Sequence, residues 1–114
     1  MLKKYLGIFS AILLFSACSF GGIEGSWTEP VPGMPSLYQG FSLRPGGKAA
    51  SINMATLQYR SWERKDNLLI LSGDSIGNHQ TIPFTETYMI KKITDRNLIL
   101  KKGTETFTFR RHNQ

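Results

Sequence analysis

The sequence predicts an all-β fold, a small antiparallel up-and-down meander of about eight strands that forms a barrel or a half-open barrel. Segments rich in β-branched and aromatic residues are separated by turn residues at intervals of roughly eight to twelve residues, which is typical of β-barrels and sandwiches. No window has apolar residues at the roughly 3.6-residue period of an amphipathic helix. A chain of 114 residues is long enough for one such domain.

Turn residues divide the chain into its expected strands. Three prolines within residues 30–35 exclude a helix and a central strand there, so a loop is expected. Gly46 and Gly47 can adopt positive φ and predict a hairpin turn over residues 44–48. A polar loop is expected over residues 73–80. The expected strands are a segment at Trp27 followed by residues 37–43, 49–53, 57–64, 68–72, 81–94 (bending at Pro83), 97–101 and 104–110.

Two of these strands differ in their pattern. Residues 57–64 alternate, and the alternation places Leu57, Tyr59 and Ser61 on one face. The opposite face carries Trp62 together with polar side chains, namely Gln58, Arg60 and Arg64. Residues 68–71 are four consecutive apolar residues, which indicates a strand that is covered on both faces.

The N-terminal residues have the features of an export signal that ends in a lipid-modified cysteine. Met1–Lys4 is a short basic segment, and the thirteen residues Tyr5–Ala17 carry no charge. That length fits the apolar region of a signal peptide, roughly 7–15 residues, and is below the roughly 20 residues that span a bilayer. The only cysteine, Cys18, follows Phe15-Ser16-Ala17, and small residues before a cysteine resemble the lipobox of bacterial lipoproteins.

The lipobox resemblance implies cleavage before Cys18, a diacylglyceryl group on its sulfur and acylation of the new amine. We therefore expect a lipoprotein signal peptide at residues 1–17, a lipidated tether at 18–24 and the barrel domain at 25–112. Two or more acyl chains hold a protein firmly at a membrane. Two alternatives remain open, namely secretion without a lipid, and a buried cysteine in an N-terminal core helix.

Composition and charge exclude several classes of function. One cysteine cannot form an internal disulfide, and two histidines leave little for a metal centre or a general base. We therefore expect no enzyme, no metal and no cofactor. The formal net charge of +6 falls to about +4 when Lys3 and Lys4 leave with the signal. We expect no nucleic-acid partner for an exported barrel, and the positive charge suits an anionic membrane surface.

Gly25-Ser26-Trp27, on the first expected strand, resembles the G-x-W signature of lipocalins and their calycin relatives. The resemblance implies that Trp27 closes one end of the barrel and that an arginine of the last strand packs across its indole. Arg110 and Arg111 end the last strand, and Arg111 is the expected partner if the face that it shares with Phe107 and Phe109 points inward.

A wider resemblance covers nearly all of residues 23–111. Residues 50–57, Trp62 and residues 73–78 are similar to the short lipocalin-like lipoproteins of Bacteroides-type bacteria. That family implies carriage of a small hydrophobic molecule. Typical lipocalins are considerably longer, so a shallow cavity, or none, is expected here.

The candidate ligand-binding residues are aromatic. Trp62, between two arginines, would line a pocket with a polar mouth, or it would pack on a neighbouring strand or the proline-rich loop. Tyr59, Phe84 and Tyr88 would line a cavity or form the core. The residue types of a hydrolase triad occur within residues 74–79, but adjacency in sequence is not triad geometry, and a polar loop explains them.

Two functions follow from these observations. The first is a lipid-anchored envelope protein that binds a small hydrophobic molecule by burying its apolar surface. The second is a non-enzymatic protein-interaction or inhibitor lipoprotein with a filled barrel, which would use the loops at residues 30–35 and 73–80. Ser19 after the cysteine resembles lipoproteins of the outer membrane, and the absence of an acidic run after it favours the periplasmic face. An incompletely closed barrel would leave an edge for a homodimer.

Overall fold

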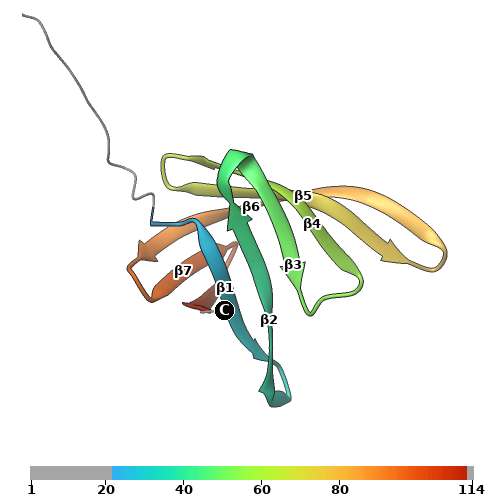
Figure 1. Cartoon of the computed structure of the whole chain (residues 1–114), viewed down its shortest axis with the longest axis horizontal. Helices are drawn as coiled ribbons and strands as arrows, with labels where there is room; N and C mark the ends of the chain where they lie inside the picture. Colours follow the sequence, from blue (N-terminus) through green and yellow to red (C-terminus); the bar gives the residue numbers. More distant parts are fainter. Residues whose placement is uncertain (1–21, 113–114) are drawn as a thin grey trace, which may run out of the picture.

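The computed structural model describes residues 22–112 and forms one closed antiparallel barrel (Figure 1). The strands are β1 (Gly25–Val31), β2 (Met34–Arg44), β3 (Lys48–Ile52), β4 (Leu57–Lys65), β5 (Leu68–Gly77), β6 (Gln80–Ile93), β7 (Asn97–Lys102) and β8 (Glu105–Arg111). Each strand pairs with the next, and β1 pairs with β8 through Trp27↔Arg111 and Thr28↔Arg110. The predicted all-β meander is therefore confirmed, and of the two predicted forms the closed barrel is the one observed. Cys18 lies outside the described residues.

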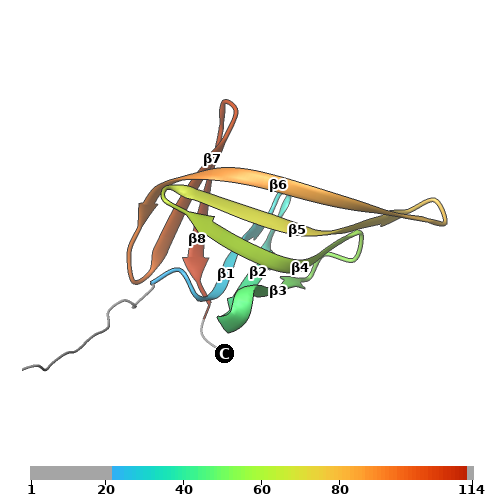
Figure 2. The same ribbon diagram turned by 90° about the horizontal axis from the view of Figure 1, so that it is seen from above.

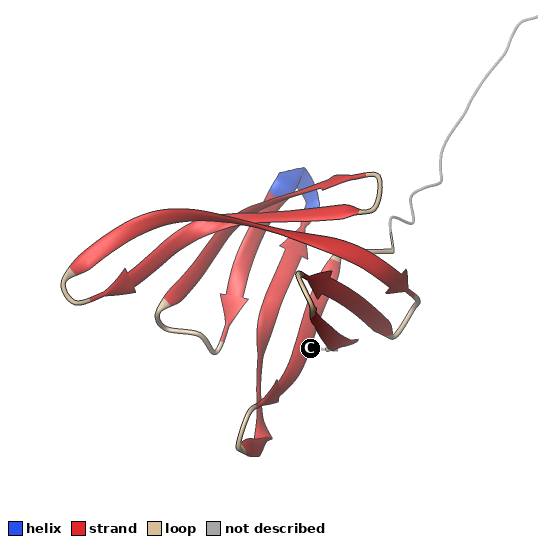
Figure 3. Ribbon diagram, turned by 180° about the vertical axis from the view of Figure 1, so that it is seen from behind, coloured by secondary structure: helices blue, strands red, loops and turns tan. Residues whose placement is uncertain are grey.

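Strands and tight turns make up nearly all of the described chain (Figure 3). The exception is the 3₁₀ turn η4 (Pro45–Gly47), where Gly46 and Gly47 have φ of 80° and 76° at the predicted β2–β3 turn. No helix within residues 22–112 is long and apolar enough to cross a membrane.

The barrel has two distinct ends, because successive strands run in opposite directions. At one end, here called the closed end, β1 begins and β8 finishes, next to the η4, β4–β5 and β6–β7 turns. At the other end, here called the mouth, lie the turns after β1, β3, β5 and β7. The β5–β6 hairpin at the mouth reaches well past its neighbours (Figure 2), and the β1–β2 hairpin also projects from the barrel (Figure 1).

Both long loops expected from the sequence are strands that end in tight turns. Residues 73–77 continue β5, which pairs with β6 from Leu68↔Met89 to Gly77↔Gln80. The turn is only Asn78 and His79, both at positive φ (49° and 62°), as a two-residue hairpin requires. This ladder satisfies the backbone of a polar segment that lacks an apolar pattern.

The proline-rich segment likewise belongs to β1 and β2. The register of that pair shifts between Pro30 and Val31, and the hairpin turns at Gly33 with φ of 80°. Proline has no N–H to donate to a neighbouring strand. At the irregular end of a hairpin no regular ladder hydrogen bond is lost, so a strand tolerates proline there.

The hydrophobic core fills the interior of the barrel from the closed end up to Tyr59, which lies toward the mouth. Strand alternation sends one face of each strand inward. The buried apolar residues are Ile23, Trp27, Phe41, Leu43, Tyr59, Leu69, Leu71, Ile90, Leu98, Leu100 and Phe109. The four apolar residues 68–71 are not uniformly covered, since Leu69 and Leu71 are fully buried while Leu68 is 38% exposed.

A β-bulge in β4 changes the faces predicted for that strand. The β4–β5 register shifts between Tyr59 and Ser61, so that Tyr59 pairs with Gly73 and Trp62 pairs with Leu71. Paired residues share a face, and Leu71 is fully buried. Tyr59 and Trp62 therefore both face the interior, whereas simple alternation had placed them on opposite faces. The extra residue of a bulge inverts the alternation beyond it.

Candidate functional site

Trp27 closes one end of the barrel, and Arg111 lies across it. The indole is fully buried, and its Nε1–H donates to the carbonyl oxygen of Ile23 at 2.8 Å. The Arg111 guanidinium lies 4.2 Å from the centre of the Trp27 ring, so the contact implied by the lipocalin resemblance is present. A cation above an indole face is attracted by the negative charge of that face.

The Arg111 guanidinium also ties three segments of chain together. Nε donates to the Asp95 carbonyl at 2.6 Å, Nη1 donates to the Glu24 carbonyl at 2.7 Å, and Nη2 donates to the carbonyl of Gly22. A Cβ on Gly25 would lie 2.3 Å from Nη1, and Gly25 has φ of +133°. Glycine is therefore required in the G-x-W segment both for space and for backbone conformation. The described part of the expected tether, residues 22–24, is held against the closed end.

Tyr59 is positioned toward the mouth by the seam between β3 and β4. Those two strands share a single register pair, Lys48↔Ser61. The Ser51 hydroxyl spans the seam, because it donates to the Leu57 carbonyl at 2.6 Å and accepts from the Tyr59 N–H at 2.8 Å. One side chain thus replaces two missing ladder bonds at the strand that carries Tyr59.

An aromatic cluster lines the interior between the core and the mouth. Tyr59 contacts Phe41 edge-on, with ring centres 5.9 Å apart, and Phe84 at 5.7 Å. Phe107 contacts Tyr88 edge-on at 5.9 Å. The structure therefore brings Tyr59, Phe84 and Tyr88 to one region of the interior, as is required of residues that line a cavity or form the core. Phe84 and Tyr88 are only half-buried, so this cluster is not sealed.

A partly buried polar network lies within the aromatic cluster. Glu86 Oε1 accepts hydrogen bonds from the hydroxyls of Tyr59 (3.1 Å) and Tyr88 (2.9 Å). Its other oxygen, Oε2, lies 3.5 Å from Lys102 Nζ, which is also 5.6 Å from the centre of the Tyr88 ring. The mouth therefore offers aromatic surface next to a carboxylate, an ammonium and two hydroxyls.

Burial shifts the titration of the groups at the mouth. Burial raises the pKa of the Tyr59 and Tyr88 hydroxyls, and the negative charge of Glu86 raises both further. Burial also raises the pKa of Glu29 on β1, which the hydrogen bond from Gln39 partly offsets. The phenols thus remain neutral donors over the whole physiological range.

Trp62 lies apart from this network, toward the closed end. Its Nε1–H donates to the Arg44 carbonyl at 2.8 Å, and its half-buried ring packs against the core. The structure therefore matches the alternative in which Trp62 packs on a neighbouring strand.

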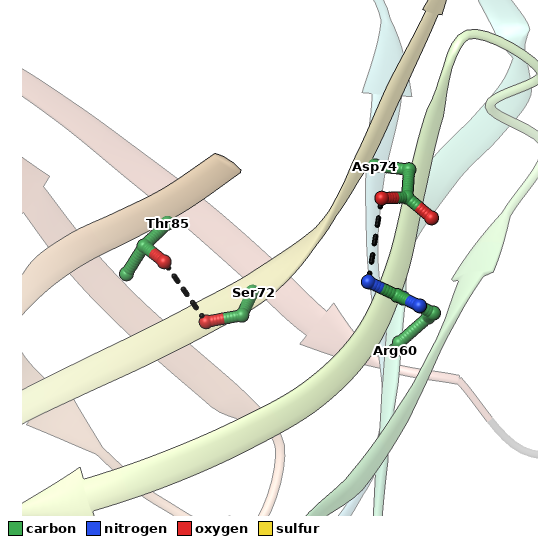
Figure 4. A network of polar contacts seen from close by, with 4 residues as sticks. All are labelled: Arg60, Ser72, Asp74 and Thr85. Carbon is green, nitrogen blue, oxygen red and sulfur yellow. Dashed lines mark hydrogen bonds and ion pairs between the residues drawn. The ribbon is translucent and has the colours of Figure 1, made fainter. Parts of the chain in front are cut away.

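Polar residues on the outer face of β4–β6 pair with one another and do not converge on a catalytic site (Figure 4). Arg60 forms an ion pair with Asp74 at 3.3 Å, and the Ser72 hydroxyl lies 3.2 Å from that of Thr85. Alternation along β5 places Ser75 on the opposite face from Asp74. Within residues 22–112, no three His, Cys, Asp or Glu side chains form a cluster that could hold a metal.

Among residues 22–112, hollows on the outside of the barrel include the following two. One, of about 480 Å³, lies at the closed end and is lined by Asp95, Arg96, Asn97, Arg110 and Arg111. The other, of about 400 Å³, is lined by Thr28, Pro30, Tyr38, Thr108 and Arg110. Neither is lined by the aromatic cluster of the mouth.

The family model described as lipocalin-like matches residues 21–112. The chain belongs to the lipocalin-like family. The crystal structure of a lipocalin-like protein from Bacteroides thetaiotaomicron is similar to it, with 45% sequence identity and a TM-score of 0.74, covering 80% of this chain and 97% of that one. No curated protein matches the sequence.

The lipocalin-like barrel contains site residues that the sequence pattern alone did not single out. Glu86 shares the inward face of β6 with Phe84 and Tyr88, so the two-residue period could have found it. Lys102 shares the face of the buried Leu98 and Leu100, but its position beside Glu86 depends on the pairing of β7 with β6. Ile23 was assigned to the tether, but it is 2% exposed and accepts the Trp27 hydrogen bond.

Proposed function

We propose that this lipocalin-like protein is a non-enzymatic, lipid-anchored envelope protein that binds a small hydrophobic molecule with one polar group at the mouth of its barrel. The observation that carries the proposal is the Tyr59–Glu86–Tyr88 network, set among half-buried aromatic rings above a filled core. Binding sites for small molecules combine apolar walls with a few convergent polar groups. The filled closed half supports a shallow site, restricted to the mouth.

The mouth extends its apolar surface onto the projecting hairpins. Ile82 lies on the same face of β6 as Phe84, and Leu37 lies near the turn of the β1–β2 hairpin. Their side chains are 55% and 46% exposed. Exposed apolar residues beside a polar network offer a surface that the apolar part of a ligand can cover.

The lipid anchor is proposed from Cys18 and from where the described chain begins. The Gly22 carbonyl accepts a hydrogen bond from Arg111 at the closed end, and Gly22 is four positions after Cys18. Four residues span at most about 14 Å. A lipid on Cys18 would hold the closed end near the membrane and point the mouth away from it, toward the periplasm under the proposed location. Replacing Cys18 by alanine is expected to move the protein from the membrane fraction to the soluble fraction when the membranes are washed at high salt, which immunoblotting of both fractions would measure.

Ligand binding is tested with N-phenyl-1-naphthylamine, a neutral probe whose fluorescence rises in apolar surroundings. The chain from Ser19 onward contains every strand and every core residue described above, and its fold is checked by circular dichroism. Replacing Phe84 by alanine is expected to weaken probe binding about tenfold, which corresponds to about 1.4 kcal/mol. Met89→Ala is the matched control, because Met89 is 47% exposed on the outer face of the same strand.

The outcomes separate the two functions. Probe binding that is lost in Phe84→Ala and kept in Met89→Ala supports the carrier. A folded wild-type chain that binds no probe would overturn the carrier and favour the protein-interaction function, in which case pull-downs from solubilised envelopes become the next measurement. The polar group is tested by Tyr88→Phe, which keeps the ring and removes one hydroxyl.

A further inference from the structure

Charge is distributed unequally between the two ends of the barrel. The closed end carries nine basic residues, Arg44, Lys48, Arg64, Lys65, Lys91, Lys92, Arg96, Arg110 and Arg111, and four acidic ones, Glu24, Glu63, Asp66 and Asp95. Nine minus four gives +5 at that end. The mouth half carries three basic residues, Arg60, Lys101 and Lys102, and four acidic ones, Glu29, Asp74, Glu86 and Glu105, a balance of −1. The positive charge of the described barrel therefore belongs to its closed end.

An arginine-lined hollow lies within that basic end. It has a volume of about 480 Å³, and Arg96, Arg110 and Arg111 contribute three of its five lining residues. The Arg111 guanidinium is occupied by backbone carbonyls. The guanidinium groups of Arg96 and Arg110 are exposed, and among residues 22–112 neither guanidinium has a hydrogen bond or an ion pair. Guanidinium groups bind phosphate oxygens through two parallel hydrogen bonds.

We propose that the closed end is a docking face for an anionic phospholipid bilayer, with one lipid phosphate bound in the hollow between Arg96 and Arg110. The described chain begins at this end (Figure 1), where the Gly22 carbonyl accepts a hydrogen bond from Arg111. The mouth is the opposite end of the barrel, so a membrane at the closed end would not contact it. The proposal does not rest on ligand binding or on lipidation of Cys18, since the charge and the hollow belong to residues 22–112.

The expected effect follows from the number of charges removed. Each basic residue near an anionic lipid surface strengthens binding about fivefold. The double variant Arg96→Gln, Arg110→Gln should therefore bind roughly 25-fold more weakly. The double variant Arg60→Gln, Lys101→Gln removes the same charge from the mouth half. Four or five strand residues separate those positions from the closed end, about 13–17 Å, which exceeds the Debye length of about 10 Å at 0.1 M salt. This control should lose less than about twofold.

The test is flotation of the unlipidated chain from Ser19 onward with vesicles of phosphatidylcholine alone, or with 30% phosphatidylglycerol, at 0.1 M salt. We expect binding to the anionic vesicles only, with the loss confined to the Arg96, Arg110 variant. Thermal melts of both variants verify folding. Wild type that does not float with anionic vesicles, or equal losses in the two variants, would overturn the proposal.

Two further arms separate this proposal from its neighbours. Inorganic phosphate titrated into the chain without vesicles, followed by calorimetry at the same ionic strength, should show no binding, whereas tight binding would make the hollow a site for free phosphate and refute the docking face. N-phenyl-1-naphthylamine binding should be the same in both double variants. If the protein binds the probe but not the vesicles, the docking face is refuted and the carrier function is not. If it binds the vesicles but not the probe, the carrier function is refuted and the docking face is not.

Discussion

Replacing Arg111 by alanine is expected to destabilise the barrel strongly, although the side chain lies at its very end. The guanidinium covers Trp27 and donates to the carbonyls of Gly22, Glu24 and Asp95. Those carbonyls belong to the segment before β1 and to the turn between β6 and β7, while Arg111 belongs to β8. One side chain therefore joins three parts of the chain across the seam at which the barrel closes.

The magnitude of the destabilisation follows from the interactions that the substitution removes. Three hydrogen bonds to carbonyls that are partly open to water contribute about 0.5–1 kcal/mol each. The stacking of the guanidinium on the indole contributes about 1 kcal/mol. The sum is about 3 kcal/mol, and in a domain of this size each kcal/mol lowers Tm by about 4–8 °C. We expect Tm to fall by about 12–24 °C.

The assay is thermal unfolding followed by circular dichroism, with urea unfolding followed by tryptophan fluorescence as a second probe. Arg110→Ala is the matched control, because Arg110 is the adjacent residue, exposed on the other face of β8. It should change stability by less than about 0.5 kcal/mol. Arg111→Lys keeps the charge but loses the planar fork, so its stability should lie between those of wild type and Arg111→Ala. Equal melting temperatures for Arg110→Ala and Arg111→Ala would refute the assignment of Arg111 as the closing residue.

Three further predictions concern the wall and the mouth. Gly73→Ala should lower Tm, because the added Cβ would lie 2.0 Å from the Gln58 carbonyl oxygen and would keep β4 and β5 from pairing closely. Gly77→Ala is the control, because no atom lies within 4 Å of its added Cβ, and its Tm should be close to that of wild type. Glu29→Gln should raise Tm at pH 7, because the raised pKa of the Glu29 carboxyl means that its charged form destabilises the fold. The difference in Tm between the variant and wild type should vanish as pH falls below the ordinary pKa of 4.5. A difference in Tm that persists at pH 3 would contradict this origin. Burial raises the pKa of the Tyr59 and Tyr88 phenols, so the phenolate absorbance of these two tyrosines at about 295 nm should appear only with alkaline unfolding, and stability should fall as pH rises above 10.

The two-residue alternation and the turn residues of the sequence were sufficient to predict the number of strands and, for much of the barrel, which side chains face inward. Strict alternation in the last strand placed Phe107, Phe109 and Arg111 on one face, which is the face the barrel buries. Alternation is local information, since neighbouring side chains of any extended segment point in opposite directions. The same rule failed at β4, because a bulge adds one residue that the composition of the strand does not announce.

What the sequence by itself determined about this protein is the class of fold, the order of its strands, the aromatic signature at its closed end and the expectation of a lipid on Cys18. Only the tertiary structure decided that the barrel closes and that Trp62 packs toward the closed end, whereas Tyr59 lies toward the mouth. It also decided that Glu86 and Lys102 form an ion pair at the mouth. It also decided that the basic residues gather at one end. Strand pairing sets these distances, and pairing depends on contacts between residues far apart in the chain, as between Arg111 and Gly22, 89 residues away. A local pattern carries no information about such partners until the sheet is closed.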